Sequence, residues 1–149
     1  MKVQRVRKVK LPTRGTPKSA GLDFYVPDDH EDYCISPRQS VVIPSGIRVE
    51  VPEGYALIAF NKSGIAVKKH LYVGACVIDE DYQGEIHIHL TNVGSTYVYI
   101  HPGDKIAQFI LLPVLYSQVE EVDELHKVPT ERGTGAFGST DDKDNLKYC

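Results

Sequence analysis

The sequence predicts an all-β domain of the barrel or jelly-roll type, and three observations support this prediction. Short segments in which polar and apolar residues alternate recur through most of the chain. Turn sequences rich in proline and glycine separate these segments. No segment of ten or more residues keeps the 3.6-residue period of an amphipathic helix. Many short strands at this spacing are typical of β-barrels and jelly rolls.

The predicted strands are segments with period-two alternation or a short apolar run. They are residues 41–43, 47–51, 55–60, 86–90, 97–100 and 106–112. The turns that bound them are Pro-Ser-Gly at 44–46, Pro-Glu-Gly at 52–54, Tyr-Gln-Gly at 82–84 and His-Pro-Gly at 101–103. Residues 63–69 are expected to form a short helical turn, and the polar residues 28–36 a loop.

Length and charge limit the classes of function. A chain of 149 residues has the size of one domain and buries a core without needing disulfides. Its net charge of −3 argues against a protein that coats nucleic acid or an anionic membrane. A small anionic ligand remains possible, because it needs only local positive groups.

The cysteine and hydropathy patterns favour a cytoplasmic protein. Cys34, Cys76 and Cys149 are an odd number without a C-x-x-C pair, which indicates free thiols in a reducing compartment. The first thirty residues have no apolar signal core, and no apolar run approaches the length of a membrane span.

The apolar pattern stops after Leu125, so we expect a β-barrel domain at 1–126 and a mobile C-terminal arm at 127–149. An extended chain from 128 to 137 reaches roughly 30 Å. The radius of gyration of a domain of this length is only roughly 15 Å. The arm is therefore long enough to cross a neighbouring subunit.

The arm contains a G-x-G-x-x-G sequence at 133–138, but its context excludes a dinucleotide-binding loop. Such a loop lies between a strand and a helix, and neither pattern surrounds this one. Closely spaced glycine amides can still approach anionic oxygens, and Arg132 and Ser139 add donors. The alternative is a solubilising tail, for which an embedded arginine and Phe137 have no purpose.

Residues 74–87 are expected to form a strand, a tight turn and a second strand, with an acidic tip. Asp79 follows the apolar pair Val77 and Ile78, which makes it a candidate general base. On this segment alone, a charged strand end explains the pattern equally well.

Together with its neighbours, this segment resembles the trimeric dUTP nucleotidohydrolase (dUTPase) family. Five family motifs occur in the family's order: Ala-Gly-Leu-Asp-Phe at 20–24, Asn-Lys-Ser-Gly-Ile-Ala at 61–66, the segment 74–84, Pro-Gly-Asp-Lys-Ile-Ala-Gln at 102–108, and 132–140. Each motif is weak alone, but five in order are very specific. The resemblance implies a distorted jelly-roll β-barrel and a homotrimer whose active sites are shared between subunits. It also implies hydrolysis of dUTP to dUMP and pyrophosphate, which lowers dUTP and supplies dUMP for thymidylate synthesis.

The resemblance also implies residue roles. Asp79 would orient and activate a water for in-line attack on the α-phosphorus, and Asp23 would bind Mg²⁺ through water. The other implied residues contact the substrate: Lys62, Ser63, Gly64, Gln108, Arg132, Gly138 and Ser139 the phosphates, Tyr82 the deoxyribose, and Cys76, His87 and Phe137 the uracil.

Three positions depart from the family pattern. Lys62 stands where arginine is usual and lacks its planar fork, so weaker phosphate binding is expected. Cys76 and Ala136 both replace a common glycine, and Ala136 restricts the backbone of the arm.

Two other functions remain as alternatives. A dCTP deaminase shares much of this pattern, although the acid here lies in the phosphohydrolase-like Ile-Asp-Glu-Asp-Tyr context at 78–82 and zinc deaminase signatures are absent. A non-enzymatic jelly-roll protein would bind nucleotide without turnover, but would have no need of Asp79 and Arg132.

Overall fold

The computed structural model describes residues 1–125, 128–136 and 139, and these residues form eleven strands and one short helix. The chain divides into two units, Met1–Tyr116 and Ser117–Cys149, and every strand and the helix lie in the first. The predicted division at residue 126 stays a prediction. Among the described residues, no helix has the length and apolar character required to span a membrane.

The strands are short and follow one another with little helix between them. In chain order they are β1 (Lys2–Arg5), β2 (Leu22–Tyr25), β3 (Tyr33–Ile35), β4 (Ser40–Pro44), β5 (Ile47–Glu50), β6 (Tyr55–Phe60), β7 (Leu71–Val73), β8 (Val77–Ile78), β9 (His87–Asn92), β10 (Val98–Ile100) and β11 (Lys105–Pro113). The helix α1 (Ser63–Lys69) follows β6.

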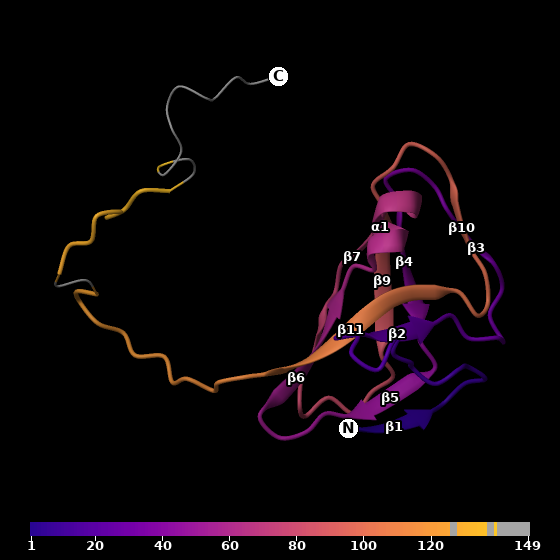
Figure 1. The fold of residues 1–149 in the computed structure, drawn as a ribbon, viewed down its shortest axis with the longest axis horizontal. Helices are drawn as coiled ribbons and strands as arrows, with labels where there is room; N and C mark the ends of the chain where they lie inside the picture. The colour runs from indigo at the N-terminus through magenta and orange to yellow at the C-terminus, as the bar shows by residue number, and fades with distance from the viewer. Residues whose placement is uncertain (126–127, 137–138, 140–149) are drawn as a thin grey trace. The chain divides into compact units, whose positions relative to one another are not determined.

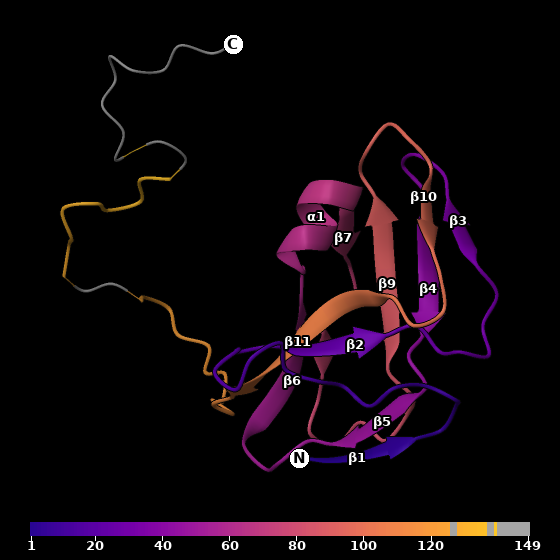
Figure 2. The same ribbon diagram turned by 45° about the vertical axis from the view of Figure 1, so that its right-hand side comes forward.

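The strands form four antiparallel sheets (Figures 1 and 2). The largest has the order β2-β11-β6-β8, and a three-stranded sheet has the order β4-β9-β7. The pairs β1-β5 and β10-β3 complete the unit. The predicted all-β, jelly-roll class is confirmed. The described sheets, however, do not form a closed barrel.

All six predicted strands are present, and α1 has the bounds expected of the helical turn. Strands β1, β2, β3 and β7 were not predicted, whereas β8 lies within the first strand expected of residues 74–87. The expected polar loop at 28–36 contains β3, which pairs with β10 through Cys34 and Tyr99. A three-residue strand with one buried side chain, Ile35, is too short to show a period.

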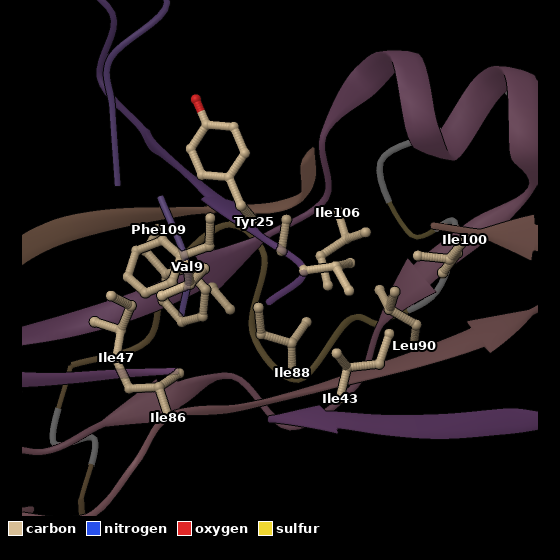
Figure 3. Packing of buried hydrophobic residues seen from close by; sticks show 14 of the residues in the cluster. Val9, Tyr25, Ile43, Ile47, Ile86, Ile88, Leu90, Ile100, Ile106 and Phe109 are labelled. Atoms are coloured by element: carbon tan, nitrogen blue, oxygen red, sulfur yellow. The ribbon is translucent and has the colours of Figure 1, made fainter. Parts of the chain in front are cut away.

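The core lies between the sheets and is formed by the buried positions of the alternating segments (Figure 3). In β9, Ile88 and Leu90 are buried while His87 is exposed, as alternation predicts. The rings of Phe24 and Phe109 pack in a tilted arrangement with their centroids 4.3 Å apart, which joins β2 to β11. This packing fixes the two strands that carry Asp23, Lys105 and Gln108.

Candidate active site

Asp23 on β2 is a buried carboxylate that two lysines share. Only 4% of Asp23 is exposed. Lys62 Nζ lies 2.7 Å from Oδ1, and Lys105 Nζ lies 2.9 Å from Oδ2. A buried carboxylate without such partners would be strongly unfavourable. The lysine side chains remain 30% and 41% exposed, so the cluster presents a net positive charge to solvent.

The same contacts determine the protonation of Asp23. Burial by itself raises the pKa of the carboxyl group, but the hydrogen bonds and positive charges of Lys62 and Lys105 outweigh burial, and the pKa lies below its ordinary value. The hydrogen bond to Asp23 and the charge of Asp23 raise the pKa of Lys105. Both groups are therefore charged at neutral pH.

Gln108 on β11 connects the first, second and fourth motifs. It is the register partner of Asp23 across the β2–β11 pair. Its Nε2 donates to the carbonyl oxygen of Asn61 at 2.9 Å. A Cβ on Gly21 would lie 2.5 Å from Gln108 Oε1 and 3.0 Å from its Cβ, so only glycine leaves room for this side chain. Residues that the sequence separates widely thus meet at one corner.

Ser63 and Gly64 form the first turn of α1, directly after Lys62, and both are exposed. Lys62 has extended backbone angles, and its side chain makes no capping hydrogen bond. The amides of a helix's first turn have no intrahelical acceptor. The structure therefore places Lys62, Ser63, Gly64 and Gln108 in one region, as a shared phosphate-binding role requires.

The acidic segment is not the expected hairpin. Strand β8 pairs with β6, whereas β9 pairs with β4 and β7, so the two flanking strands belong to different sheets. Asp79 follows β8 and accepts a hydrogen bond from Tyr82 N at 3.2 Å, which closes a turn at the predicted acidic tip. Because the strand ends at Ile78, strand alternation does not govern the acids beyond it.

Asp79, Glu80 and Asp81 line a groove of about 480 Å³, together with Tyr55, Ala56, Val114 and Tyr116. Asp79 is exposed. Among the described residues, the carboxylates of Asp79 and Asp81 have no hydrogen-bond partner, whereas Glu80 has two. Asp79 is therefore free to contact a water or a ligand.

Tyr82 has a fixed orientation in this structure. Its hydroxyl donates to the carbonyl oxygen of Glu85 at 2.8 Å. A Cβ on Gly84 would contact the hydroxyl and lie 2.6 Å from Cζ, so the ring packs directly on the glycine backbone. Tyr82 is still 41% exposed, which leaves a ring surface for a ligand.

Cys76 and His87, the two residues expected to bind uracil through their backbones, differ in the hydrogen-bonding groups that are already used. The Cys76 carbonyl already accepts from Ala59 N at 2.7 Å, and its thiol is directed at the carbonyl of Gly74. In the described part of the chain, the Cys76 amide has no backbone partner. His87 is exposed at the start of β9, and its Nδ1 lies 2.9 Å from the carbonyl oxygen of Glu85.

In the second unit, the backbone around Arg132 forms consecutive turns. Gly133 has φ +52° and donates to Thr130, and Gly135 N donates to the Arg132 carbonyl at 3.0 Å. Arg132 Nε donates to the Gly135 carbonyl oxygen at 3.1 Å, and Ser139 N donates to the Ala136 carbonyl at 2.9 Å. The predicted contacts of Phe137 and Gly138 lie outside the described residues.

Asp79 and Lys62 lie at opposite ends of β6. The pairing of Leu57 with Ile78 places Asp79 beside the start of β6, whereas Lys62 follows its end. A six-residue strand spans roughly 20 Å. The acidic turn and the Asp23 corner are therefore two separate regions of one chain.

Sequence reasoning did not identify Lys105, Glu80 or Gly84 as site residues. Lys105 lies inside the fourth motif, and only the pairing of β2 with β11 brings it to Asp23. Gly84, two residues after Tyr82, was a possible signal of close packing, because a residue without a Cβ lets the tyrosine ring approach the backbone.

Comparison with known proteins identifies relatives over nearly the whole chain. The dUTPase family model matches residues 7–141. Over 130 residues the chain is 43% identical to the deoxyuridine 5'-triphosphate nucleotidohydrolase of Mus musculus, covering 87% of this chain and 76% of the mouse protein. It is 42% identical over 130 residues to the mitochondrial enzyme of that name in Homo sapiens, covering 87% of this chain and 49% of the human protein.

Solved structures agree with this result. A mutant of the Staphylococcus bacteriophage 80alpha dUTPase with dUpNHpp matches with a TM-score of 0.84 and 25% identity, covering 93% of this chain and 96% of that chain. A mutant dUTPase from phage phi11 of S. aureus, described with a structural Mg(II) ion, matches with a TM-score of 0.76 and 23% identity, covering 84% and 97%. The second likeness shows the fold alone.

Proposed function

This chain belongs to the dUTPase family, and we propose that it hydrolyses dUTP to dUMP and pyrophosphate by magnesium-assisted, in-line attack of water on the α-phosphorus. The class of enzyme is a deoxyuridine 5'-triphosphate nucleotidohydrolase, as the names of its curated relatives state. The observation that carries the proposal is the convergence of Asp23, Lys62 and Gln108 at one corner. The cell thereby lowers dUTP and gains dUMP for thymidylate synthesis.

The Asp23 corner is suited to a triphosphate. Lys62 and Lys105 share one carboxylate, so the region has an excess positive charge that attracts a polyanion. Ser63, Gly64 and Gln108 supply a hydroxyl, amides and a side-chain amide beside them. Phosphoryl transfer depends mostly on positioning and charge neutralisation, which these groups provide.

Asp79 is proposed to hold the attacking water. Its carboxylate is exposed and has no partner among the described residues, and the groove beside it admits solvent. A carboxylate at this place accepts a hydrogen bond from the water and points an oxygen lone pair of that water at the phosphorus. Its proton then passes to the carboxylate as the phosphorus–oxygen bond to pyrophosphate breaks.

The chain's residues fit a magnesium ion that keeps its water shell. In the described part of the chain, no three His, Cys, Asp or Glu side chains gather as a metal cage. Asp23 pairs each oxygen with a lysine, but each carboxylate oxygen has a second lone pair that can accept a hydrogen bond from a water. Bound Mg²⁺ would neutralise phosphate charge. Asp23 would hold it through water rather than by direct coordination.

Backbone groups are proposed to select uracil. In the described part of the chain the Cys76 amide has no backbone partner, so it can donate to an acceptor on the uracil edge. The backbone of His87 lies on the strand that follows the acidic turn. Cytosine reverses the donor and acceptor on this edge, which can lower its efficiency by roughly 10⁴-fold. Tyr82, packed on Gly84, would lie under the deoxyribose and exclude a ribose 2′-hydroxyl.

The separation of the two regions supports a homotrimer with shared sites. The acidic turn and the Asp23 corner are separated by the length of β6, roughly 20 Å, which is too far for both to contact one α-phosphate region. A second subunit can bring its acidic turn to the first subunit's Asp23 corner. Arg132, Phe137, Gly138 and Ser139 are proposed to complete the site from the arm of a subunit.

One assay tests the function against its alternatives. Release of pyrophosphate and of ammonia is measured with dUTP, dCTP and the three other common deoxynucleoside triphosphates, with Mg²⁺ and with EDTA. Pyrophosphate from dUTP alone, lost in EDTA, is the expected result. Ammonia from dCTP would establish a deaminase, and nucleotide binding without either product would establish a non-enzymatic protein. A cytoplasmic location is also proposed, and a fluorescent fusion of the full chain tests it.

A further inference from the structure

Two glutamates hold the acidic turn at its two ends, and each does so through the amide of a left-handed glycine. Glu80 Oε2 accepts from Gly54 N at 2.8 Å, and Gly54 has φ +75°. Glu85 Oε1 accepts from Gly46 N at 2.8 Å, and Gly46 has φ +72°. The segment between these glutamates is therefore fixed to the glycines that directly precede β5 and β6.

Glu85 Oε1 also accepts from Arg7 Nε at 2.9 Å, and Glu80 makes a second contact with a different segment. Its Oε2 also accepts from the hydroxyl of Tyr116 at 2.6 Å. Tyr116 is the last residue of the first unit and follows β11. Val114 N donates to the Gly54 carbonyl at 2.8 Å, so the glycine turn and the end of β11 are themselves joined. Glu80 thus connects three segments at one carboxylate oxygen.

The neighbours of Glu80 in sequence differ from it. Asp79 and Asp81 line the same groove, but no described residue donates a hydrogen bond to either carboxylate. All three consecutive acids line the groove, but only the middle one, Glu80, is hydrogen-bonded through its carboxylate to other described residues. This arrangement fixes the backbone on which Asp79 is carried.

We propose that Glu80 is a positioning residue for the hydrolysis of dUTP, which it serves by holding the Asp79 turn against Gly54 and Tyr116. This inference rests on the proposed function. An in-line attack needs the water within a few tenths of an ångström of the reactive line, and a displacement of roughly 1 Å can lower the rate about 100-fold. A two-residue strand, β8, gives the turn little support of its own.

The electrostatics agree with this geometry. The hydrogen bond from Tyr116 and then that from Gly54 lower the pKa of Glu80, so its carboxylate is ionised at neutral pH. The hydrogen bond to Glu80 raises the pKa of Tyr116, so the phenol keeps its proton. The Tyr116 hydroxyl is thus protonated and the Glu80 carboxylate ionised at neutral pH, as their hydrogen bond requires.

The experiment compares Tyr116→Phe, Glu80→Ala and the double variant with the unmodified chain. Tyr97→Phe is the matched control, because Tyr97 is similarly exposed and its hydroxyl has no described partner. Pyrophosphate release gives kcat and KM for dUTP, calorimetry gives the Kd of a non-hydrolysable dUTP analogue, and a thermal scan gives the Tm. Glu80→Asp tests whether a shorter carboxylate rescues Glu80→Ala.

We expect kcat to fall roughly 10-fold in Tyr116→Phe and roughly 10- to 100-fold in Glu80→Ala, with KM and analogue Kd nearly unchanged. The double variant should lose less than the product of the single effects, because both remove one structural unit. An unchanged kcat in Glu80→Ala overturns the proposal. The proposal is also overturned if the activity falls because KM rises or because the Tm drops, and not because kcat falls. An unmodified chain that leaves dUTP intact overturns the proposed function itself, which separates the two failures.

Discussion

The ammonium group of Lys62 lies 2.7 Å from Oδ1 of Asp23, which is the one buried acidic residue in the described part of the chain. Lys62 directly precedes α1, and Asp23 lies within β2, so the ion pair connects two motifs. Lys105 adds a second ammonium from β11. The pair thus has a structural role, which stabilises the corner, and a proposed functional one, which presents positive charge to a triphosphate.

Replacing Asp23 with asparagine should lower the free energy of unfolding by roughly 2 kcal/mol, because two lysines lose a charged acceptor. The pKa of Asp23 is depressed below its ordinary value of 3.8, so its ionised form stabilises the fold fully above that pH. This contribution is lost as the pH falls through the lower, folded-state pKa. The Tm difference between the two chains, measured from pH 6 downward, should narrow below about pH 3.8. A difference that is independent of pH would contradict the ion pair.

Replacing Asp79 with asparagine should abolish release of pyrophosphate from dUTP while leaving the Kd of a non-hydrolysable analogue within a few-fold. The amide keeps the size of the side chain but cannot accept the proton of the water. Calorimetry and a pyrophosphate assay on the same preparation give both values. Retained turnover would remove Asp79 from the reaction.

Replacing Gly84 with alanine should raise KM for dUTP more than it lowers the Tm. The new Cβ would lie 2.6 Å from Cζ of Tyr82, so the ring must leave its place on the backbone. Gly103→Ala provides a contrast, since nothing lies within 4 Å of its Cβ, although its φ of +81° adds strain. If Tyr82 supports the sugar, Gly84→Ala should also lose discrimination against UTP. If the KM of Gly84→Ala equals that of the unmodified chain, the Tyr82 ring does not contact the substrate.

Mixing two inactive chains tests whether sites are shared. Asp79→Asn lacks the acid of the turn, and Ser63→Ala/Gln108→Ala weakens the phosphate corner at the other end of β6. Co-refolding them should restore part of the dUTPase activity, because some sites of a mixed trimer receive an intact group from each chain. Equal amounts of each chain refolded alone are the control. Activity that stays at the level of the controls would place both regions in one subunit's site.

The sequence was sufficient for the strands whose side chains alternate. In β9 the buried Ile88 and Leu90 alternate with the exposed His87 and the partly exposed His89. This alternation has the two-residue period of a strand, so it can be read from the sequence. The same holds for α1, because its bounds follow from local signals. Strands as short as β3 and β8 have no readable period, and their pairing with β10 and β6 depends on partners far away in the chain.

The residue types of the candidate site were also present in the sequence, since the order of five motifs indicated the family and the matching relatives confirm it. The family motif indicated a role for Asp79 but none for Glu80. Only the turn geometry shows that Glu80 is bound to Gly54 and Tyr116. Asp23 was predicted to face magnesium, and only the structure shows that two lysines share its oxygens.

The sequence by itself thus determined the class of fold and the family, because alternation and motif order are properties of neighbours along the chain. Only the tertiary structure decided which charged groups meet, which carboxylates have no partner among the described residues, and that the Asp23 corner and the acidic turn lie at opposite ends of β6. The reason is physical: the energy of a charge depends on its surroundings in space, and those surroundings are assembled from segments that the chain keeps far apart.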